Sequence, residues 1–256
     1  MGTRVVTEQH ERLIVIIIEF RFCNFMTSVK LVLCFVFAAY CSALATNLPV
    51  PWPEKFSIKF VSNITTSVSA PVVPIYNTMY YDSSIKLQRV DHGAGSYECV
   101  NFYFSDLPCT IWFTPDGLYR QLNAPLPPSQ PDCCLDMPDI KASAPNWAAQ
   151  TDPLPTFLGI DNDVYSGMKT NHWAFLAYDP SSQKGYHEYR QVTGDNNGLN
   201  GRPLVFTFPV QDGMQDYHFD PNSMIFEQPD SNLFTLPVSC RKSDGTPNLC
   251  PQSARK

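Results

Sequence analysis

Three pairs of aspartates could supply the two carboxyl groups that acid–base catalysis requires. A glycosidase takes its two carboxyls from different strands, so spacing along one segment does not identify such a pair. Most of these aspartates lie near Gly, Pro or Asn, where a turn explains them because Asp side chains bond nearby backbone amides. We therefore assign no catalytic role to the pairs, which are Asp136/Asp139, Asp161/Asp163 and Asp212/Asp216.

The histidines and serines form no recognised catalytic motif. Residues 93–96 (GAGS) fall short of the G-x-S-x-G nucleophile motif. His187-Glu188 lacks the second histidine of H-E-x-x-H, and the two side chains are expected on opposite faces of a strand. His172 and His218 stand singly beside aromatic residues, which favours a half-buried packing role. The sequence predicts that the protein is not an enzyme. A secreted hydrolase, with carboxylates or a histidine meeting across strands, is kept as an alternative.

Two oxygen-rich segments could ligate calcium, which prefers clustered oxygen ligands. They are residues 161–163 (DND) and 194–198 (GDNNG). Neither belongs to a twelve-residue loop with the terminal glutamate that EF-hands use. We keep Asp161 and Asp163 as candidate metal ligands and calcium as the candidate ion, and we expect no other cofactor.

Large aromatic side chains are concentrated in the segments that alternate like strands. They could form a plain sandwich core, or they could line a cavity on the concave face of a curved sheet. Periodicity does not separate these interpretations, because both require an apolar inner face. The candidate ligand-binding residues are Phe102, Phe104, Trp112, Phe113, Tyr119, Trp173, Phe175, Phe206, Phe208 and Phe226.

The elements that would position these residues are predicted to be strands. Alternation at residues 56–60, a turn at 82–84 between two strands, and Pro115-Asp116-Gly117 between two more are the strongest signals. Further strands are expected at 99–104, 157–165, 172–178, 204–208 and 216–219, with a Pro-rich loop at 124–139. The best helix candidate, around 223–229, is short. Roughly ten strands with regular turns predict an all-β sandwich or a curved, partly open barrel.

Composition excludes several other classes. The 256 residues are 16% charged and 13% aromatic, which is the reverse of a disordered chain. The net charge of -6 gives no basic surface for nucleic acid. The 23 prolines are incompatible with a helical bundle.

The N-terminal segment predicts secretion. Residues 26–30 carry one positive charge, 31–44 form an uncharged apolar run, and 43–45 (ALA) fit a cleavage site. A transmembrane anchor is the alternative, but a span needs about 20 residues and this run is shorter. We expect residues 1–25 to be a gene-model extension, 26–45 a signal peptide and 46–256 one β domain with no transmembrane anchor.

The six cysteines after the signal peptide predict three disulfides, since a secreted chain meets oxidising conditions. They are Cys99, Cys109, Cys133, Cys134, Cys240 and Cys250. Zinc is the alternative, but no C-x2-C pair occurs. Each of the adjacent pair Cys133-Cys134 should reach a different partner, because bonding neighbours strains the backbone. Asn63-Ile64-Thr65 is an N-glycosylation sequon.

The order of several short motifs resembles the ependymin-related proteins. The C-terminal half carries the likeness in residues 216–226 (DYHFDPNSMIF) and 233–240 (LFTLPVSC). Upstream, residues 80–91, Cys99, residues 116–119 followed by Cys133-Cys134, and Phe157 to Tyr178 are similar to that family's hairpins and cysteines. The resemblance covers roughly residues 55–242.

The resemblance implies a secreted or lysosome-lumen glycoprotein. Its fold would be two stacked antiparallel sheets forming a curved half-barrel, similar to bacterial lipoprotein carriers, with a hydrophobic pocket and few short helices. It also implies dimers and some calcium association. Carried over, Cys134 or Cys133 would pair with Cys240, and Cys99 with Cys250. Cys109 would be left with Cys133, a pair outside the family's usual set.

The leading function is binding of a lipid or other apolar small molecule in that pocket, where each buried methylene is worth about 0.8 kcal/mol. A calcium-associated protein of the extracellular matrix or cell adhesion, with matrix components as partners, is the alternative.

Overall fold

The computed structural model describes residues 47–66, 74–103, 106–123, 131–178, 184–194, 197–210 and 213–250. The predicted extension 1–25 and signal peptide 26–45 lie outside these residues, as do Phe104 and Asp212. The residues from Leu48 onward form one compact unit. No helix in the described ranges is long and apolar enough to cross a membrane.

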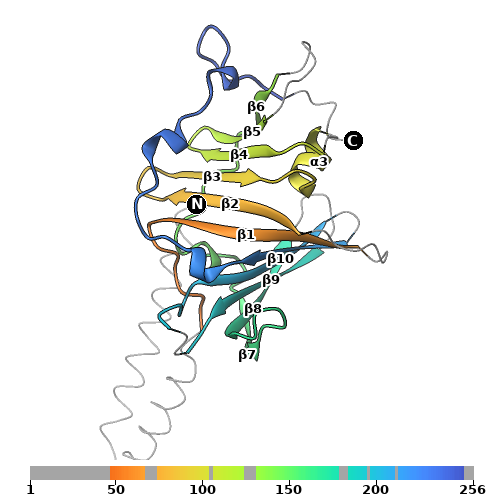
Figure 1. The fold of residues 1–256 in the computed structure, drawn as a ribbon, viewed down its shortest axis with the longest axis vertical. Helices are drawn as coiled ribbons and strands as arrows, with labels where there is room; N and C mark the ends of the chain where they lie inside the picture. The colour runs from red at the N-terminus through yellow and green to blue at the C-terminus, as the bar shows by residue number, and fades with distance from the viewer. Residues whose placement is uncertain are drawn as a thin grey trace, which may run out of the picture. The chain divides into compact units, whose positions relative to one another are not determined.

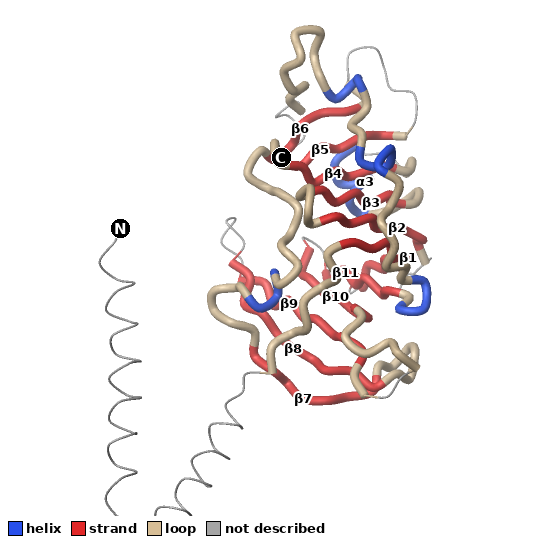
Figure 2. Tube along the Cα trace, turned by 90° about the vertical axis from the view of Figure 1, so that its left-hand side faces the viewer, coloured by secondary structure: helices blue, strands red, loops and turns tan. Residues whose placement is uncertain are grey.

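The described chain is nearly all β, as predicted, and its strands form one antiparallel sheet (Figure 1). The order across the sheet is β6-β5-β4-β3-β2-β1-β11-β10-β9-β8-β7. Figure 2 shows the strands stacked in a single curved sheet, so the two layers implied by the resemblance are continuous through hydrogen bonds. The strands are β1 Lys55–Thr66, β2 Ile75–Asp82, β3 Leu87–His92, β4 Cys109–Thr114, β5 Gly117–Leu122, β6 Cys133–Met137, β7 Thr156–Asn162, β8 Lys169–Tyr178, β9 Lys184–Val192, β10 Pro203–Val210 and β11 Gly213–Phe219.

The first and last strands meet in the middle of this sheet. From β1 the chain builds outward strand by strand to β6, crosses to the far edge at β7, and returns inward to β11. Strand β11 then pairs with β1 in the register Phe60↔Phe219 and Asn63↔Asp216. The predicted glycosylation site Asn63 therefore lies in β1, and its side chain is outside what the structure describes.

The predicted turns follow from local chemistry. At the β2–β3 turn, the Ser84 amide and hydroxyl both donate to Asp82 Oδ1, at 3.0 and 2.5 Å. At the β4–β5 turn, Gly117 has φ +132°, and a Cβ there would lie 2.6 Å from the Met137 carbonyl oxygen. Only glycine fits this position, because the backbone of the next hairpin passes against it.

Three sequence predictions of secondary structure are wrong. A strand is expected at residues 99–104, whereas Tyr97–Tyr103 form helix α3, in whose first turn Cys99 N and Val100 N donate to Ser96 O. Strand β6 lies in the stretch predicted as a Pro-rich loop. The helix expected at 223–229 is absent from the described chain, because Ile225 exchanges both backbone hydrogen bonds with Ser57 of β1.

The two faces of the sheet are both covered, and we define them by their residues. The inner face carries Phe60, Val90 and Phe206, and the outer face carries Arg89 and Trp112. The C-terminal segment contains the short helices η2 (Pro221–Ser223), η3 (Ser231–Phe234) and η4 (Val238–Cys240). It covers the outer face of β3 to β6, where Arg89 Nη1 donates to the Leu233 carbonyl at 3.1 Å and Leu236 packs against Trp112 and Tyr119.

Three disulfides are present, as predicted, and each adjacent cysteine reaches a different partner. The pairs are Cys99–Cys109, Cys133–Cys240 and Cys134–Cys250. The implied pairs Cys99–Cys250 and Cys109–Cys133 are wrong. Helix α3 brings Cys99 beside the start of β4, and residues 248–250 run along the open edge of β6, with Leu135 N donating to Asn248 O at 2.6 Å.

The disulfides should contribute similarly to stability although their sequence separations are 10, 107 and 116 residues. An isolated loop of about 100 residues is worth about 4.7 kcal/mol, but the two long disulfides close nearly the same loop. If one long disulfide is removed, the other still holds the ends of this loop together. Removing any single disulfide by Cys→Ala substitution should therefore lower the free energy of unfolding by about 3 kcal/mol.

Urea denaturation of the three paired variants checks this expectation. Removing both long disulfides together should cost more than the sum of the two separate losses. A loss near 4.7 kcal/mol for the Cys133–Cys240 pair alone would contradict the shared-loop argument.

Candidate functional site

The inner face of the sheet forms the wall of a half-open cavity of about 770 Å³. Strands from both halves of the sheet contribute to its wall, since β5 and β10 lie six places apart in the strand order. The sheet must therefore curve around the cavity. The lining residues are Trp52, Phe60, Met79, Gln88, Val90, His92, Tyr97, Glu98, Ile111, Phe113, Leu118, Arg120, Asp136, Met137, Ser143, Trp147, Tyr189, Phe206, Phe208, Tyr217 and Phe219.

The period of two along each strand selects these side chains. On β3, Gln88, Val90 and His92 face the cavity, while Arg89 and Asp91 between them bond to each other on the outer face at 2.8 Å. Across the central pairing, Phe206 of β10 lies opposite Tyr217 of β11, and Phe219 lies opposite Phe60. The wall is thus a continuous aromatic surface.

Two tryptophans from outside the sheet close one side of the cavity. Trp147 opens η1 (Trp147–Ala149) in the β6–β7 connection, and its ring lies 5.8 Å from Phe175 and 5.7 Å from Phe206. Trp52 lies 5.5 Å from Trp147, and its indole nitrogen donates to the Tyr189 hydroxyl at 2.8 Å. Burial raises the pKa of Tyr189, which stays a neutral phenol that can accept this hydrogen bond.

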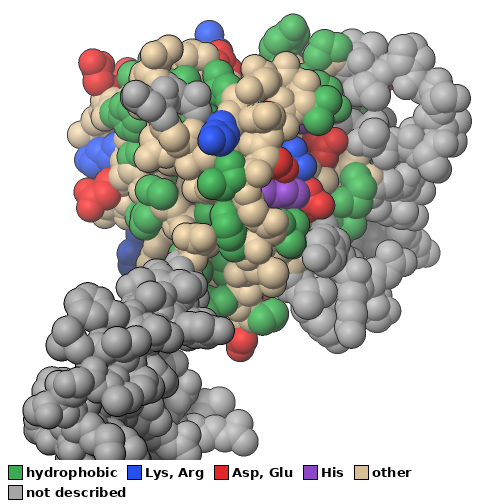
Figure 3. All heavy atoms as spheres, turned by 90° about the horizontal axis from the view of Figure 1, so that it is seen from below, with side chains coloured by type: hydrophobic (Ala, Val, Ile, Leu, Met, Phe, Trp, Pro, Cys, Tyr) green, Lys and Arg blue, Asp and Glu red, His purple; other side chains and the backbone are tan. Residues whose placement is uncertain are grey.

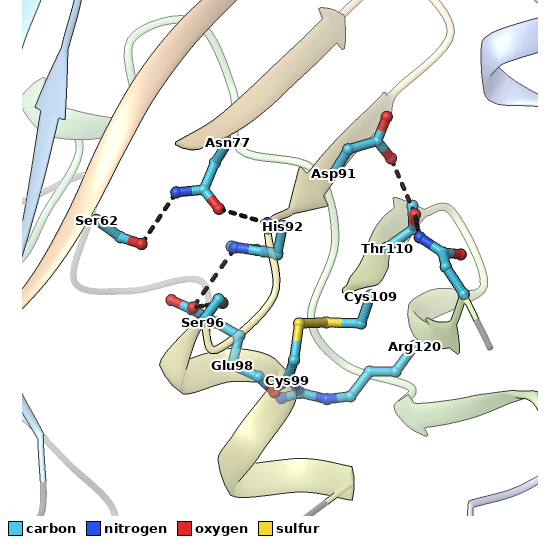
Figure 4. Close-up of a disulfide and its surroundings, with 12 residues drawn as sticks. Ser62, Asn77, Asp91, His92, Ser96, Glu98, Cys99, Cys109, Thr110 and Arg120 are labelled. Carbon is cyan, nitrogen blue, oxygen red and sulfur yellow. Dashed lines mark hydrogen bonds and ion pairs between the residues drawn. A yellow bond between two sulfur atoms is a disulfide. The ribbon is translucent and has the colours of Figure 1, made fainter. Parts of the chain in front are cut away.

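The opposite end of the cavity is polar, and Figure 4 labels three of its lining residues, His92, Glu98 and Arg120. The Glu98 side chain, on α3, accepts hydrogen bonds from Ser96 Oγ at 2.6 Å, from Gln215 Nε2 at 2.8 Å and from the Tyr217 hydroxyl. Arg120 Nε donates to Asp136 Oδ2 at 2.8 Å, and its Nη1 donates to the Glu98 carbonyl at 3.3 Å. The cavity therefore offers a long apolar wall and one charged end.

His92 is buried beside this charged end. Its Nδ1 lies 3.5 Å from Glu98 Oε2 and makes no hydrogen bond to a described residue. Burial lowers the pKa of His92, and Arg120 acts in the same direction, while Glu98 and Asp91 oppose the shift. The imidazole is therefore neutral near pH 7.

The structure places the ten predicted ligand-binding residues in different environments. Phe113, Phe206 and Phe208 line the cavity. Trp173 and Phe175 belong to the cluster packed against Trp147. The side chain of Phe102 and all of Phe104 lie outside the described residues.

Three of the ten do not face the cavity. Trp112 and Tyr119 lie on the outer face against the Cys133–Cys240 disulfide, because each is adjacent to an inward-facing residue of its strand. Phe226 is 52% exposed, with the Arg202 guanidinium 4.6 Å above its ring. Aliphatic lining residues such as Val90 and Leu118 escaped prediction, although strict alternation from Phe113 across the Gly117 turn could have identified Leu118.

The candidate calcium ligands Asp161 and Asp163 already have partners in the protein. Asp161 accepts from Thr170 Oγ1 at 2.5 Å and lies 3.2 Å from His172 Nδ1. Asp163 Oδ2 accepts from the Tyr165 and Ser166 amides, which is a turn role. In the described ranges, no three His, Cys, Asp or Glu side chains are grouped to hold a metal ion.

The remaining polar candidates also have structural roles. His187 and Glu188 point to opposite faces, as predicted: His187 packs against Phe206, and Glu188 Oε2 lies 3.0 Å from His172 Nε2. His172 is therefore bound between two carboxylates, where the sequence predicted packing. In the view from the β7 side, a histidine lies among acidic and basic side chains and apolar groups are dispersed (Figure 3). Asp139 is exposed, whereas Asp136 pairs with Arg120.

Comparisons with known proteins give only distant likenesses. No protein-family model matches the sequence, and no curated protein matches it. Similar solved structures include an uncharacterised conserved protein of Thermus thermophilus, 13% identical over 76% of this chain and 89% of that one, with a TM-score of 0.44. A LolA-superfamily protein of Nitrosomonas europaea is 10% identical over 75% of this chain and 94% of that one, with a TM-score of 0.36. LprF of Mycobacterium bovis is 11% identical over 70% and 87%, with a TM-score of 0.33. The resemblance to ependymin-related proteins stays a prediction from the sequence.

The buried histidines make folding stability depend on pH. Burial lowers the pKa values of His92, His187 and His218. Their folded values thus lie below the unfolded value of about 6.5, so the unfolded chain takes up protons first on acidification. The free energy of unfolding should be steady above about pH 6.5 and fall below it, by at most about 1.4 kcal/mol per pH unit for each histidine.

Urea denaturation at about pH 7.5, 6 and 5 measures this dependence. His92→Gln should reduce the loss of stability on acidification. A free energy of unfolding that stays constant or rises between pH 7.5 and 5 would show that burial does not hold these rings neutral.

Proposed function

We propose that this protein binds a lipid or similar amphiphile in the cavity of its curved sheet, without catalysing a reaction. The observation that carries the proposal is the cavity of about 770 Å³ with its largely apolar lining. Ligand pockets commonly measure about 300–1,000 Å³ and combine apolar walls with a few polar groups. The polar end formed by Glu98, Arg120 and Asp136 would hold the headgroup, and the aromatic wall would hold the chain.

The energy for such binding comes from burial of the chain. Each methylene moved from water into the cavity is worth about 0.8 kcal/mol, so a chain of about fifteen carbons gains about 12 kcal/mol. After an association cost of about 4 kcal/mol, about 8 kcal/mol remains, which corresponds to micromolar affinity. The cavity wall is also fixed in advance, because two of its lining residues, Trp52 and Ser143, are each held by a hydrogen bond. Trp52 N donates to the Pro145 carbonyl at 2.8 Å, and the Tyr81 hydroxyl donates to the Ser143 carbonyl at 2.7 Å.

The proposal includes secretion into an oxidising compartment. Three disulfides in one domain support it, because thiols stay reduced in the cytosol. The signal-peptide pattern at residues 26–45 and the Asn63 sequon are consistent with the same route. A lysosome lumen, calcium association and dimers stay predictions from the resemblance.

Single substitutions of two predicted aromatic residues that line the cavity, with a third outside it as the control, test the binding site. Phe113→Ala and Phe208→Ala each remove part of the cavity wall, so each should weaken saturable Nile red binding about tenfold, as expected for about 1.5 kcal/mol of lost apolar contact. Phe226→Ala is the matched control, since Phe226 lies outside the cavity and should leave binding unchanged.

The protein for this test should come from a eukaryotic secretory host, so that its disulfides form. Organic extraction should then release a co-purifying amphiphile from the wild type, and less of it from the Phe113 and Phe208 variants. Mass spectrometry identifies and quantifies the released molecule. Absence of saturable Nile red binding, together with an empty protein on extraction, would rule the proposal out.

A further inference from the structure

The polar groups that line the cavity are unevenly distributed. Glu98, His92, Arg120 and Asp136 are contiguous, because Arg120 contacts both the Asp136 carboxylate and the Glu98 backbone, and His92 faces the Glu98 carboxylate. They come from α3, β3, β5 and β6, and Figure 4 shows Glu98, His92 and Arg120 around the Cys99–Cys109 disulfide. An amphiphile in the cavity would therefore meet charge at one end only.

The positive charge at this end is already matched. Arg120 Nε lies 2.8 Å from Asp136 Oδ2, and the two side chains are 14% and 2% exposed. Arg120 Nη1 is committed to the Glu98 carbonyl. The pair contributes no net charge, and releasing Arg120 for an anionic ligand would leave a buried carboxylate without its partner, which is costly.

The negative charge of Glu98 is not matched in the same way. In the described part of the chain, its carboxylate accepts hydrogen bonds from Ser96, Gln215 and Tyr217, which are all neutral donors. The ionisable nitrogen within salt-bridge range is His92 Nδ1, which burial keeps neutral. The Glu98 side chain is only 13% exposed, so little water screens its charge.

Two further atoms at this end lack hydrogen bonds to described residues. His92 is 5% exposed and its Nδ1 makes none. Gln215 is fully buried, and its amide oxygen Oε1, which can only accept, has no donor. Of the two, Gln215 Oε1 is the acceptor, because a neutral His92 that faces the Glu98 carboxylate presents Nδ1–H to it. A buried acceptor without a donor is costly, so a ligand that brings N–H groups would be favoured here.

We propose that the cavity selects amphiphiles whose headgroup is an ammonium, with Glu98 as the counter-ion, over amphiphiles of equal chain length with a carboxylate. This inference rests on the proposed function, because it concerns the same cavity. An ammonium brings one positive charge and up to three N–H donors, which match the Glu98 carboxylate and the nearby acceptor Gln215 Oε1. A carboxylate brings a like charge next to Glu98 and no donor.

Displacement of Nile red by three amphiphiles with the same dodecyl chain tests the inference on the wild-type protein. Dodecylamine should bind at least about tenfold more tightly than dodecanoate, with dodecanol between them, since about 1.4 kcal/mol of charge interaction corresponds to tenfold. Ethylamine carries the headgroup without the chain and should not displace the probe, which separates a lipid amine from a small free amine.

Glu98→Gln identifies the group responsible. The amide keeps a side chain of the same shape but removes the charge, so dodecylamine should lose about tenfold in affinity while dodecanol is unchanged. Glu227→Gln makes the same charge change at an exposed position outside the cavity, and its ranking should match the wild type. Circular dichroism and the dodecanol affinity confirm that Glu98→Gln is folded.

The outcomes separate the two proposals. Displacement by all three amphiphiles with dodecanoate equal to or tighter than dodecylamine overturns the headgroup inference and leaves apolar binding in place. A ranking unchanged by Glu98→Gln also overturns it. No saturable Nile red binding, together with an empty protein on extraction, overturns the proposed function itself. If Glu98→Gln does not fold, the wild-type ranking alone decides.

Discussion

The pairing of β1 with β11 is the interaction on which the rest of the structure depends. Strand β1 hydrogen-bonds to β2 on one side and to β11 on the other, and these bonds are the join between the first and second halves of the sheet. The cavity wall takes Phe60 and Val90 from one half and Phe206 from the other. Without the central pairing there would be two open sheets, neither of which encloses anything.

The second constraint is that every strand has two faces with different tasks. On the inner face the side chains of β3, β4 and β5 line the cavity; on the outer face Arg89, Trp112 and Tyr119 pack under the C-terminal segment. The same alternation places His187 against the aromatic wall and Glu188 in the outer ion pairs. The cavity on one face thus depends on a separate core that stabilises the other face.

Local signals in the sequence were enough for most of the strands, for their turns and for the class of the fold, but not for β6 and β9. The Asp82 and Gly117 turns follow from short-range chemistry, and alternation identifies β1 and β10. Helix α3 was missed because Cys99 to Phe104 alternates like a strand, whereas the disulfide to Cys109 and the bonds of Glu98 hold it as a helix. The cavity residues were only partly predictable, since their convergence depends on strand order. Glu98 could not be identified as a site residue from the sequence, because its contacts with Gln215 and Tyr217 of β11 depend on the tertiary fold.

The adjacent cysteines of β6 could form disulfides with the wrong partners. Cys133 and Cys134 could in principle exchange partners, joining Cys133 to Cys250 and Cys134 to Cys240, and both versions would contain the same number of bonds. What distinguishes them is the pleat: successive side chains of a strand point to opposite sides, so Cys133 meets Cys240 on the outer face, and Cys134 is left for Cys250 at the strand edge. Correct oxidation therefore requires that β6 already be a strand, and a thiol that reacts earlier has no means of choosing its partner. A wrong pair formed before the sheet would have to be exchanged for the native one by thiol–disulfide exchange once β6 is in place.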